Sequence, residues 1–548
     1  MSGQPKVDAL DAEAEATAAA AAARPAASAA WSPLRHVAFR SLWFAALCVY
    51  LAIWMQSVAG AWLMTTLTRS ALLVALMQTA ISLPMFLWSL PAGVLADLTD
   101  RRRLLITTQL IMMLASAALA TASMLGWIGT FGLLALTFLL GSGLALNGPA
   151  WQASMCESVP RHEIAQALTL IGIAYNIARA VGPAIAGVLQ AAVSPGLVFL
   201  VNAVAYAWVL GVVWRWRSPA LSSALPPERL VSGILSGLRY AAHAGAVRAP
   251  VIRTAAFMLP ASALWALLPV VGQGRLGASA AGFGLLIGSL GVGAIVAGVS
   301  LSWLRQRFAV EASIAVASVS YAVVLVLSGV LTSVWVLCPV LMIGGASWSV
   351  SLTLLNAAML TSIPTWVRSR TIALYMLGSQ GFMAAGAALW GALASGAGTE
   401  LALAAAGGLM LLTVFWGRRH RVRFGVESDV TLSPAEPQLD LRHALAPEAG
   451  PVAVEIRYRI DPADREAFLH ASEAVGTLRR RNGARRWRLY RDLSDDRIFA
   501  ERFIVDSWAD YQRQLARSTV ADQSKEVRLR AFQEPGVPIE TGHYLAER

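Results

Sequence analysis

Twelve apolar segments, each long enough to cross a lipid bilayer, constrain the fold of this 548-residue chain more than any other feature. A helix needs about 20 apolar residues to cross hydrocarbon, and in lipid its backbone polar groups must be hydrogen-bonded internally. The predicted spans are residues 41–66, 71–96, 104–125, 129–149, 166–191, 196–214, 251–272, 279–304, 310–330, 334–357, 371–395 and 399–417. We therefore predict an all-α membrane protein with twelve transmembrane helices in two six-helix halves.

Composition and charge support this prediction. Hydrophobic residues make up 57% of the chain and charged residues only 14%, against roughly 25% charged in soluble domains. The net charge of +12 comes largely from arginines at span ends, which is the positive-inside pattern and not a nucleic-acid surface. One side carries Arg101–Arg103, Arg215, Arg305, Arg307 and Arg418, and the other carries Arg69 and Arg275. We expect the first side, and both termini, to be cytoplasmic, and we expect no nucleic-acid partner.

The chain divides at changes in composition. Residues 1–30 are Ala-rich with scattered carboxylates and are predicted to be a disordered cytoplasmic tail. The segment between the halves has apolar residues at helical spacing, which favours an interfacial amphipathic helix. The expected boundaries are 31–214 for the first half, 215–250 for the cytoplasmic linker, 251–424 for the second half, 425–451 for a Pro-containing linker and 452–548 for a soluble domain.

The soluble domain has a strand and helix order that predicts a ferredoxin-like α+β fold, βαββαβ. A four-stranded sheet covered on one side leaves one broad face, so we expect the domain to form a homodimer. The predicted strands are Val452–Ile460, Trp487–Asp492, Phe499–Val505 and Ile539–Leu545, and the predicted helices are Ala463–Arg481 and Trp508–Phe532.

The loop after the second span combines a small residue, a carboxylate and three arginines: Gly93, Asp97, Arg101, Arg102 and Arg103. Glycine lets two helices approach closely, and Asp97 follows one helical turn later. The arginines would stay at the membrane surface, paired with carboxylates or lipid phosphates. Two interpretations remain open: a gating loop that holds the two halves together, or a topology signal alone.

These residues resemble the loop signature of the major facilitator superfamily, Gly-x-Leu-Ala-Asp followed by Arg-Arg-Arg. Leu98 and Asp100 depart from the pattern, since the family usually has a basic residue and a glycine there. Residues 32–43, with Trp54-Met55-Gln56, resemble the branch of the enterobactin exporter and transmembrane secretion effectors. The resemblance implies a secondary active transporter in a bacterial inner membrane that exports a siderophore-like, drug or antibiotic molecule by alternating access. The C-terminal domain is similar to antibiotic-biosynthesis-monooxygenase-type dimeric α/β barrels.

Arg179 stands near the middle of the fifth predicted span. A charge at that depth costs at least about 2.5 kcal/mol, so it needs a partner or a function. It could cap carbonyls of a neighbouring helix, or face a cavity and bind an anionic cargo. The residues that follow, Gly182, Pro183 and Gly187, resemble an exporter motif in which small residues and a proline allow close packing and bending.

Several amides inside the spans are candidates for a substrate path. Each could equally form a helix–helix hydrogen bond, worth about 0.6 kcal/mol on average. Tryptophans such as Trp54, Trp265 and Trp348 could stack on an aromatic cargo or anchor helices at the interface. The amide candidates are Gln56, Gln78, Asn147, Asn176 and Gln380.

No Asp or Glu lies in the middle of any predicted span. Proton coupling would therefore need an edge carboxylate such as Asp97, or a proton carried by the cargo, or would not exist. The cysteines Cys48, Cys156 and Cys338 have no metal-ligand spacing. We expect no catalytic residue, metal or cofactor, and small-molecule cargo and membrane lipids as partners. The alternative is a transporter fused to a monooxygenase-like or ligand-sensing domain.

Asp97→Asn is expected to reduce transport, because the loop would lose the carboxylate that organises its arginines. Cysteines placed along the cytoplasmic side of the cavity should then react faster with a thiol reagent. Normal transport together with wild-type labelling rates would leave the loop as a topology signal only.

Overall fold

The computed structural model describes residues 31–160, 163–216, 244–364, 367–425, 430–431, 445–446 and 448–547. For Gly93, Asp97 and a few of their neighbours the structure describes the backbone only. The predicted N-terminal tail, the amphipathic helix between the halves and most of the second linker also lie outside the described residues.

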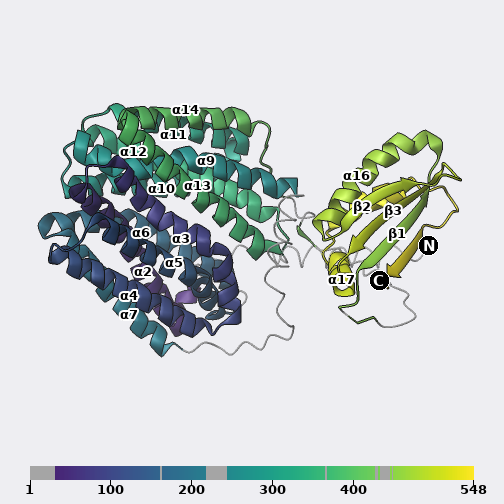
Figure 1. Ribbon diagram of the computed structural model, residues 1–548, viewed down its shortest axis with the longest axis horizontal. Helices are drawn as coiled ribbons and strands as arrows, with labels where there is room; N and C mark the ends of the chain where they lie inside the picture. Colours follow the sequence, from purple (N-terminus) through teal and green to yellow (C-terminus); the bar gives the residue numbers. More distant parts are fainter. Residues whose placement is uncertain are drawn as a thin grey trace, which may run out of the picture.

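Within the described residues, twelve helices are long and apolar enough to cross a membrane, in agreement with the predicted number. The first half contains α2 (Val37–Leu67), α3 (Ala71–Leu98), α4 (Arg101–Met124), α5 (Thr130–Glu157), α6 (Ile164–Ala192) and α7 (Pro195–Arg215). The second half contains α9 (Gly245–Val270), α10 (Ala280–Arg307), α11 (Val310–Val330), α12 (Val334–Thr361), α13 (Arg368–Ala397) and α14 (Thr399–Gly417). Figure 1 shows the two halves as neighbouring layers of one bundle.

Side-chain caps fix where several of these helices begin. Ser70 accepts a hydrogen bond from Leu73 N at the start of α3, and Ser279 accepts one from Gly282 N at the start of α10. Asp100 accepts bonds from the backbone N–H groups of Arg102 and Arg103 and so caps α4. An N-cap carboxylate satisfies otherwise unpaired donors, which explains why an aspartate can replace the usual glycine in this loop.

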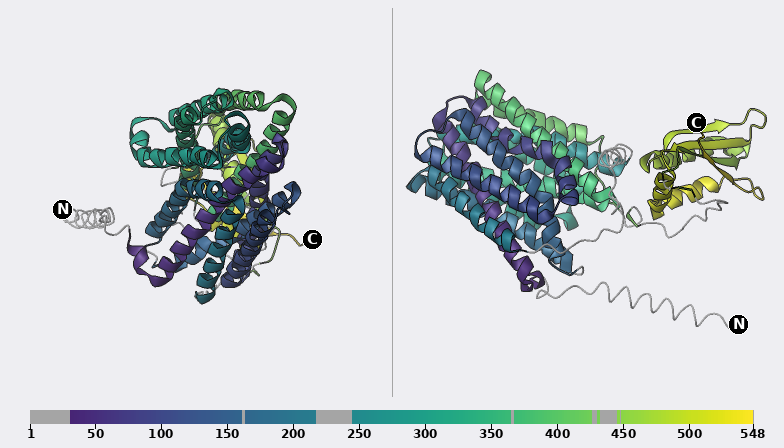
Figure 2. Two further views of the ribbon diagram at one scale, coloured as in Figure 1. Left: turned by 90° about the vertical axis from the view of Figure 1, so that its left-hand side faces the viewer. Right: turned by 60° about the horizontal axis from the view of Figure 1, so that its bottom comes forward.

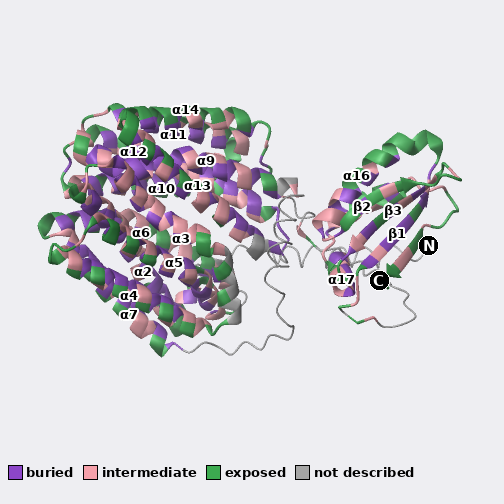
Figure 3. Ribbon diagram, in the orientation of Figure 1, coloured by how far each residue is buried: buried purple, intermediate pink, exposed green. Residues whose placement is uncertain are grey.

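The halves pack together through two equivalent helix pairs, α3 with α13 and α6 with α10. α3 and α10 are the second helices of their halves, and α6 and α13 are the fifth, so the two contacts are related by a pseudo-two-fold axis. The views in Figure 2 agree with this layering, and Figure 3 colours many residues of outer helices such as α14, α4 and α7 as exposed. This is the repeat arrangement expected of a transporter.

The ion pairs of the arginine-rich end, where α2 begins and α14 ends, link elements of the same half. Arg101 pairs with Glu157, and His36 lies 3.0 Å from Glu163 in the first half. Arg253 is 2.5 Å from Glu311 in the second half. At the opposite end Arg275 pairs with Glu400 at 2.6 Å, again within one half. These pairs connect helices within each half, and the described contacts between the halves are helix packing and hydrogen bonds such as that from Thr79 Oγ1 to the Ala384 carbonyl.

The C-terminal domain is a four-stranded antiparallel sheet in the order β2-β3-β1-β4. Its strands are β1 (Val452–Arg459), β2 (Arg485–Arg491), β3 (Ile498–Val505) and β4 (Glu540–Leu545). β1 is central and pairs with β3 from Val452↔Val505 and with β4 from Val452↔Leu545. This order and the helices α16 (Arg465–Arg481), α17 (Trp508–Ala516) and α18 (Val520–Arg530) give the predicted ferredoxin-like fold. The single predicted helix Trp508–Phe532 is wrong, because Thr519 and Asp522 form a capping box that starts a second helix.

The helix-covered side of the sheet buries a charged network. Glu501 is 1% exposed and accepts bonds from Arg479 (3.2 Å), Tyr458 (3.0 Å) and Trp487 (2.9 Å). Burial alone would lower the pKa of Arg479, but Glu501 and Glu526 raise it overall, so the guanidinium stays charged. A buried charge is tolerated only when it is paired and hydrogen-bonded in this way.

The other side of the sheet is covered by none of the described helices and is rich in arginine. Alternation along the strands places Arg457, Arg488 and Arg502 on this face together with Tyr490 and Tyr544. Glu455 bridges two of the arginines, at 2.7 Å from Arg457 and 2.5 Å from Arg502. The face is therefore polar, and a dimer formed through it would need to offset repulsion between arginines.

The segment after α14 is packed against the second half. Val422 is 4% exposed and lies among Ile314 and Leu354, and its N–H donates to Glu311. The Arg305 guanidinium lies 4.7 Å from the ring centre of Phe424. We call residues 420–425 the strap. It fastens the start of the second linker to α10, α11 and α12.

A protein truncated after Gly425 is expected to stay folded in the membrane, because it keeps the strap. A protein truncated after Arg419 should be less stable, since burying one valine is worth about 1.5–3 kcal/mol. The melting temperatures of the two purified proteins measure the difference.

The separated C-terminal domain is expected to sediment as a dimer.

Equal melting temperatures would show that the strap contributes no stability. A C-terminal domain that remains monomeric at high micromolar concentration would contradict the dimer prediction.

Candidate functional site: a central cavity between the halves

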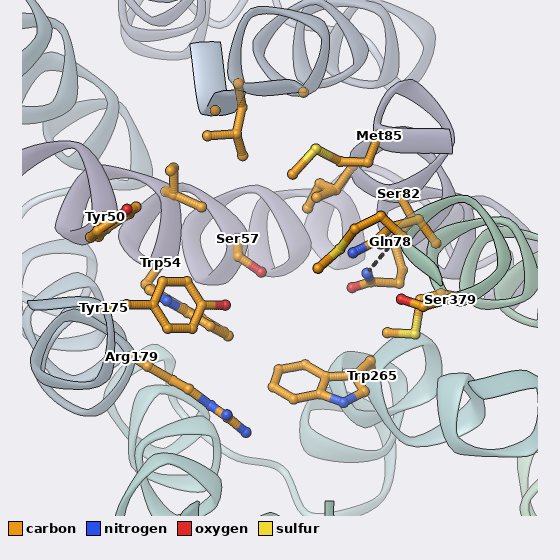
Figure 4. Close-up of a pocket in the computed structure, with 18 of the residues that line it drawn as sticks. Tyr50, Trp54, Ser57, Gln78, Ser82, Met85, Tyr175, Arg179, Trp265 and Ser379 are labelled. Atoms are coloured by element: carbon orange, nitrogen blue, oxygen red, sulfur yellow. Dashed lines mark hydrogen bonds between the residues drawn. The ribbon is translucent and has the colours of Figure 1, made fainter. Parts of the chain in front are cut away.

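A cavity of about 620 Å³ lies between the halves. It is lined by side chains from α2, α3, α5, α6 and α7 of the first half and from α9, α12 and α13 of the second. Figure 4 shows ten labelled lining residues, which surround an open centre. A concave, largely apolar site with few polar groups between two repeats is the usual form of a transporter's binding site.

Arg179 lines this cavity. Its Nε and Nη2 atoms are buried without a hydrogen-bond partner among the described residues. The guanidinium carbon lies 5.8 Å from the ring centre of Trp54, a cation–π distance. The backbone of Arg179 packs closely against α10. A Cβ added at Gly291 would lie only 2.9 Å from the Arg179 carbonyl oxygen. The arrangement differs from the carbonyl-capping role considered above, since the structure gives these two nitrogens no carbonyl partner.

Further unpaired donors lie around the same cavity. The indole N–H groups of Trp54 and Trp265, and the amide nitrogen of Gln56, are buried without partners among the described residues. The two indole rings are 5.9 Å apart and come from different halves, on α2 and α9. Each of these atoms can only donate a hydrogen bond. The donor set therefore suits a ligand that supplies acceptors, above all an anion.

The predicted amide positions separate into three groups. Gln56, Gln78 and Gln380 line the central cavity, and Gln78 donates to Ser82 at 3.0 Å. Asn147 lines a neighbouring cavity and accepts a bond from Thr108 at 3.1 Å. Asn176 lines neither of these two cavities, is exposed, and donates back to the Gly172 carbonyl at 2.9 Å. Direct contact with cargo stays a prediction for all of them.

Sequence reasoning missed the tyrosines of the cavity. Tyr50 and Tyr175 line it, and their rings are 5.4 Å apart. Each lies four residues before a residue already singled out, Trp54 or Arg179. Side chains four apart share one face of a helix, so this spacing was a usable signal.

Two glycines of the motif allow close helix packing, one within the first half and one between the halves. A Cβ on Gly182 would lie 2.8 Å from the Trp54 Cβ on α2 of the same half, and one on Gly187 would lie 2.9 Å from the Gly284 Cα of the other half, at the end opposite the arginine-rich end. α3 meets α13 there, where Leu72 N donates to Ser395 Oγ at 2.8 Å. The cavity is thus closed at this end by backbone-to-backbone contact between the halves.

Toward the arginine-rich end the central cavity continues into a second cavity of about 650 Å³, lined by α2, α3, α5, α6 and α13. Two arginines of the loop after α3 form bonds within the first half. Arg101 pairs with Glu157, and Arg102 donates to the Trp214 carbonyl. Arg103 is exposed, 4.0 Å from Asp100. A link from Asp97 to the second half stays a prediction.

Comparisons with known proteins agree on a transporter. The model of the transmembrane secretion effector family matches residues 28–548. The multidrug efflux pump Tap of Mycolicibacterium fortuitum is 26% identical over 67% of this chain and 92% of the pump. The staphyloferrin A transporter of Staphylococcus aureus is 27% identical over 29% of this chain and only 40% of that transporter.

The solved structure of a bacterial homologue of the human lysosomal transporter Spinster, in an inward-facing and unoccupied conformation, aligns with a TM-score of 0.55. The alignment covers 71% of this chain and 95% of that protein, with 14% sequence identity. At this identity the similarity concerns the fold.

Gly284→Ala is expected to destabilise this closed end, because the new methyl group would lie 2.8 Å from the Gly187 Cα of the other half. Overpacking of this kind costs about 1–3 kcal/mol, so the variant should spend more time open at that end. Labelling of a cysteine introduced at Ser57, applied from that side of the membrane, measures the change.

Gly298→Ala is the matched control on the same helix, since a Cβ there meets nothing within 4 Å. Equal labelling of the two variants would contradict the proposed closure.

Proposed function

The chain belongs to the transmembrane secretion effector family of the major facilitator superfamily, and on this premise we propose that it exports a small organic anion by alternating access. The observation that carries the proposal is Arg179, a cavity-lining guanidinium with two buried nitrogens that have no partner among the described residues. Its planar fork suits a carboxylate, sulfonate or catecholate group.

The surroundings of Arg179 strengthen the attraction to an anion. A low-dielectric cavity screens charge less than water does. The indole N–H groups of Trp54 and Trp265 can donate to the same acid group or to neighbouring acceptors. Because Trp54 and Trp265 belong to different halves, an anion held by both would draw the halves together around it. Differential binding of this kind shifts the balance between conformations.

The orientation is compatible with export and gives the side from which cargo would enter. The cavity continues toward the arginine-rich end, and arginine-rich loops mark the cytoplasmic side of a bacterial inner membrane. The described conformation would then receive cargo from the cytoplasm, with both termini on that side. Release would follow when the contacts of α3 with α13 and of α6 with α10 open. The arginines at the cytoplasmic surface would bind lipid phosphates.

The names of the relatives suggest the class of cargo. One transports the siderophore staphyloferrin A and the other is a multidrug efflux pump. A cavity of about 620 Å³ has the size of a drug-sized ligand site. We therefore propose a siderophore-like, drug or antibiotic molecule that carries an acid group. Coupling to protons, through Asp97 or the cargo, stays a prediction.

For the C-terminal domain we propose a dimerising or ligand-sensing role. Its interior is densely filled: a Cβ on Gly476 would lie 2.6 Å from the Trp487 ring. Tyr511 and His543 are bonded to each other at 2.8 Å. Burial raises the pKa of Tyr511 to about 12 and lowers the pKa of His543, so both are neutral at pH 7. No observation on the described residues favours the monooxygenase alternative.

Arg179→Lys and Arg179→Gln test the anion site. Lysine keeps the charge and loses the fork, while glutamine loses both, so anion uptake into inverted vesicles should fall in the order wild type, Lys, Gln. A charge-assisted pair is worth about 1.5–3 kcal/mol, which predicts a ten-fold or larger loss for Gln. Uptake is measured at matched amounts of folded protein.

Asn176→Leu provides a control on the same helix, because Asn176 lines neither cavity and the change adds no charge to the membrane-spanning segment. An anion flux that does not change with glutamine at position 179 would overturn the proposal. A loss of folded protein in both Arg179 variants, with anionic and neutral cargo affected equally, would assign the arginine a structural role.

A further inference from the structure

The central cavity and the second cavity adjoin each other. They share six lining residues: Tyr50, Met85, Leu144, Gly148, Met376 and Gln380. These shared residues come from α2, α3, α5 and α13, so the two cavities meet between these four helices. An extended ligand in the central cavity would reach the second one at this junction.

One face of α5 runs along both cavities. Its lining residues recur every three or four positions: Thr137, Leu140, Leu144, Gly148, Gln152 and Cys156. On a helix with 3.6 residues per turn these six positions stay within one half of the circumference. At 1.5 Å per residue, the 19 steps from Thr137 to Cys156 cover about 28 Å. The two cavities together are therefore extended along α5.

The two ends of this space differ in chemistry. Arg179 and the unpaired indole and amide donors surround the central cavity. The second cavity is lined mainly by small and apolar side chains, including Ala46, Val49, Ala153 and Ile372. Its Asn147 oxygen already accepts a bond from Thr108. The second cavity also contains polar groups, among them Gln152 and the unpaired indole N–H of Trp151. The central end thus offers a cation with unpaired donors, and the other end offers mainly apolar surface without a charged side chain among its described lining residues.

We propose that the joined cavities bind an extended anionic amphiphile, with its acid group on Arg179 and its apolar chain along α5 toward Cys156. The inference rests on the proposed anion export and narrows the cargo to acids that carry a long apolar part. Each methylene removed from water strengthens binding about four-fold. An acid with a long chain should therefore bind far better than a short one of equal charge.

Two sulfonates test this: butanesulfonate and dodecanesulfonate, which stay ionised at all relevant pH values. Binding of each radiolabelled probe to the full chain in lipid nanodiscs is measured by equilibrium dialysis, below micelle concentrations and with empty discs subtracted. The wild type should bind dodecanesulfonate at least ten-fold more tightly than butanesulfonate. Arg179→Gln should weaken both, because both place the acid group there. Dodecyltrimethylammonium, with the same chain and opposite charge, should bind weakly.

A larger side chain in the second cavity tests whether the alkyl chain of the probe lies there. Ala153→Trp should fill this cavity and remove the preference for dodecanesulfonate while leaving butanesulfonate binding unchanged. Ala118→Trp, at an exposed position on α4 outside both cavities, is the matched control and should change neither. Dodecanesulfonate should also slow alkylation of Cys156 in a Cys48→Ala, Cys338→Ala background, and butanesulfonate should not.

The outcomes separate this inference from the proposed function. Equal, Arg179-dependent binding of both sulfonates would overturn the amphiphile and leave anion export standing, with the second cavity a water-filled entrance. Chain-length preference that survives Ala153→Trp would also overturn it. If neither sulfonate depends on Arg179, the anion site itself is wrong.

Discussion

The rest of the membrane domain is arranged around the charge of Arg179, which is held in a low-dielectric cavity between two helical bundles. A charge at this depth costs at least about 2.5 kcal/mol and is retained where it has a function. The chain supplies a cation–π contact with Trp54 and close backbone support from Gly291. It leaves two of the guanidinium nitrogens without a partner among the described residues. A cargo anion would supply the hydrogen-bond acceptors that these nitrogens lack.

The same region also sets how the halves move. The described ion pairs lie within the halves, while the contacts between halves include glycine packing, aromatic contacts such as Trp54 with Trp265, and a few hydrogen bonds. Such an interface can separate without breaking a buried charge pair. Gly187 on α6 and Gly284 on α10 form a seam between the halves. Arg179 and Gly291 lie on the same two helices, closer to the arginine-rich end. Binding at Arg179 and opening of the seam therefore act on the same pair of helices.

The sequence was sufficient for features that depend on local composition. The twelve spans follow from apolar length, and the ferredoxin-like domain follows from the order of its strands and helices. Contacts between distant residues could not be predicted, because they depend on how the helices pack. Arg101 with Glu157, Val422 with Glu311 and the different surroundings of Asn147 and Asn176 are examples. The direction of the Arg179 side chain could not be predicted either. A sequence indicates how deep a residue lies in the membrane, but not which helices its side chain faces.

The most direct test of this account is to locate a heavy-atom anion in the protein. The structure of the full chain with 4-iodobenzenesulfonate, solved with the anomalous signal of iodine, would show where an organic anion binds. The account predicts the sulfonate within hydrogen-bond distance of the Arg179 guanidinium, in the cavity between Trp54 and Trp265. Iodine only outside this cavity, with the Arg179 nitrogens bonded to backbone carbonyls, would contradict it.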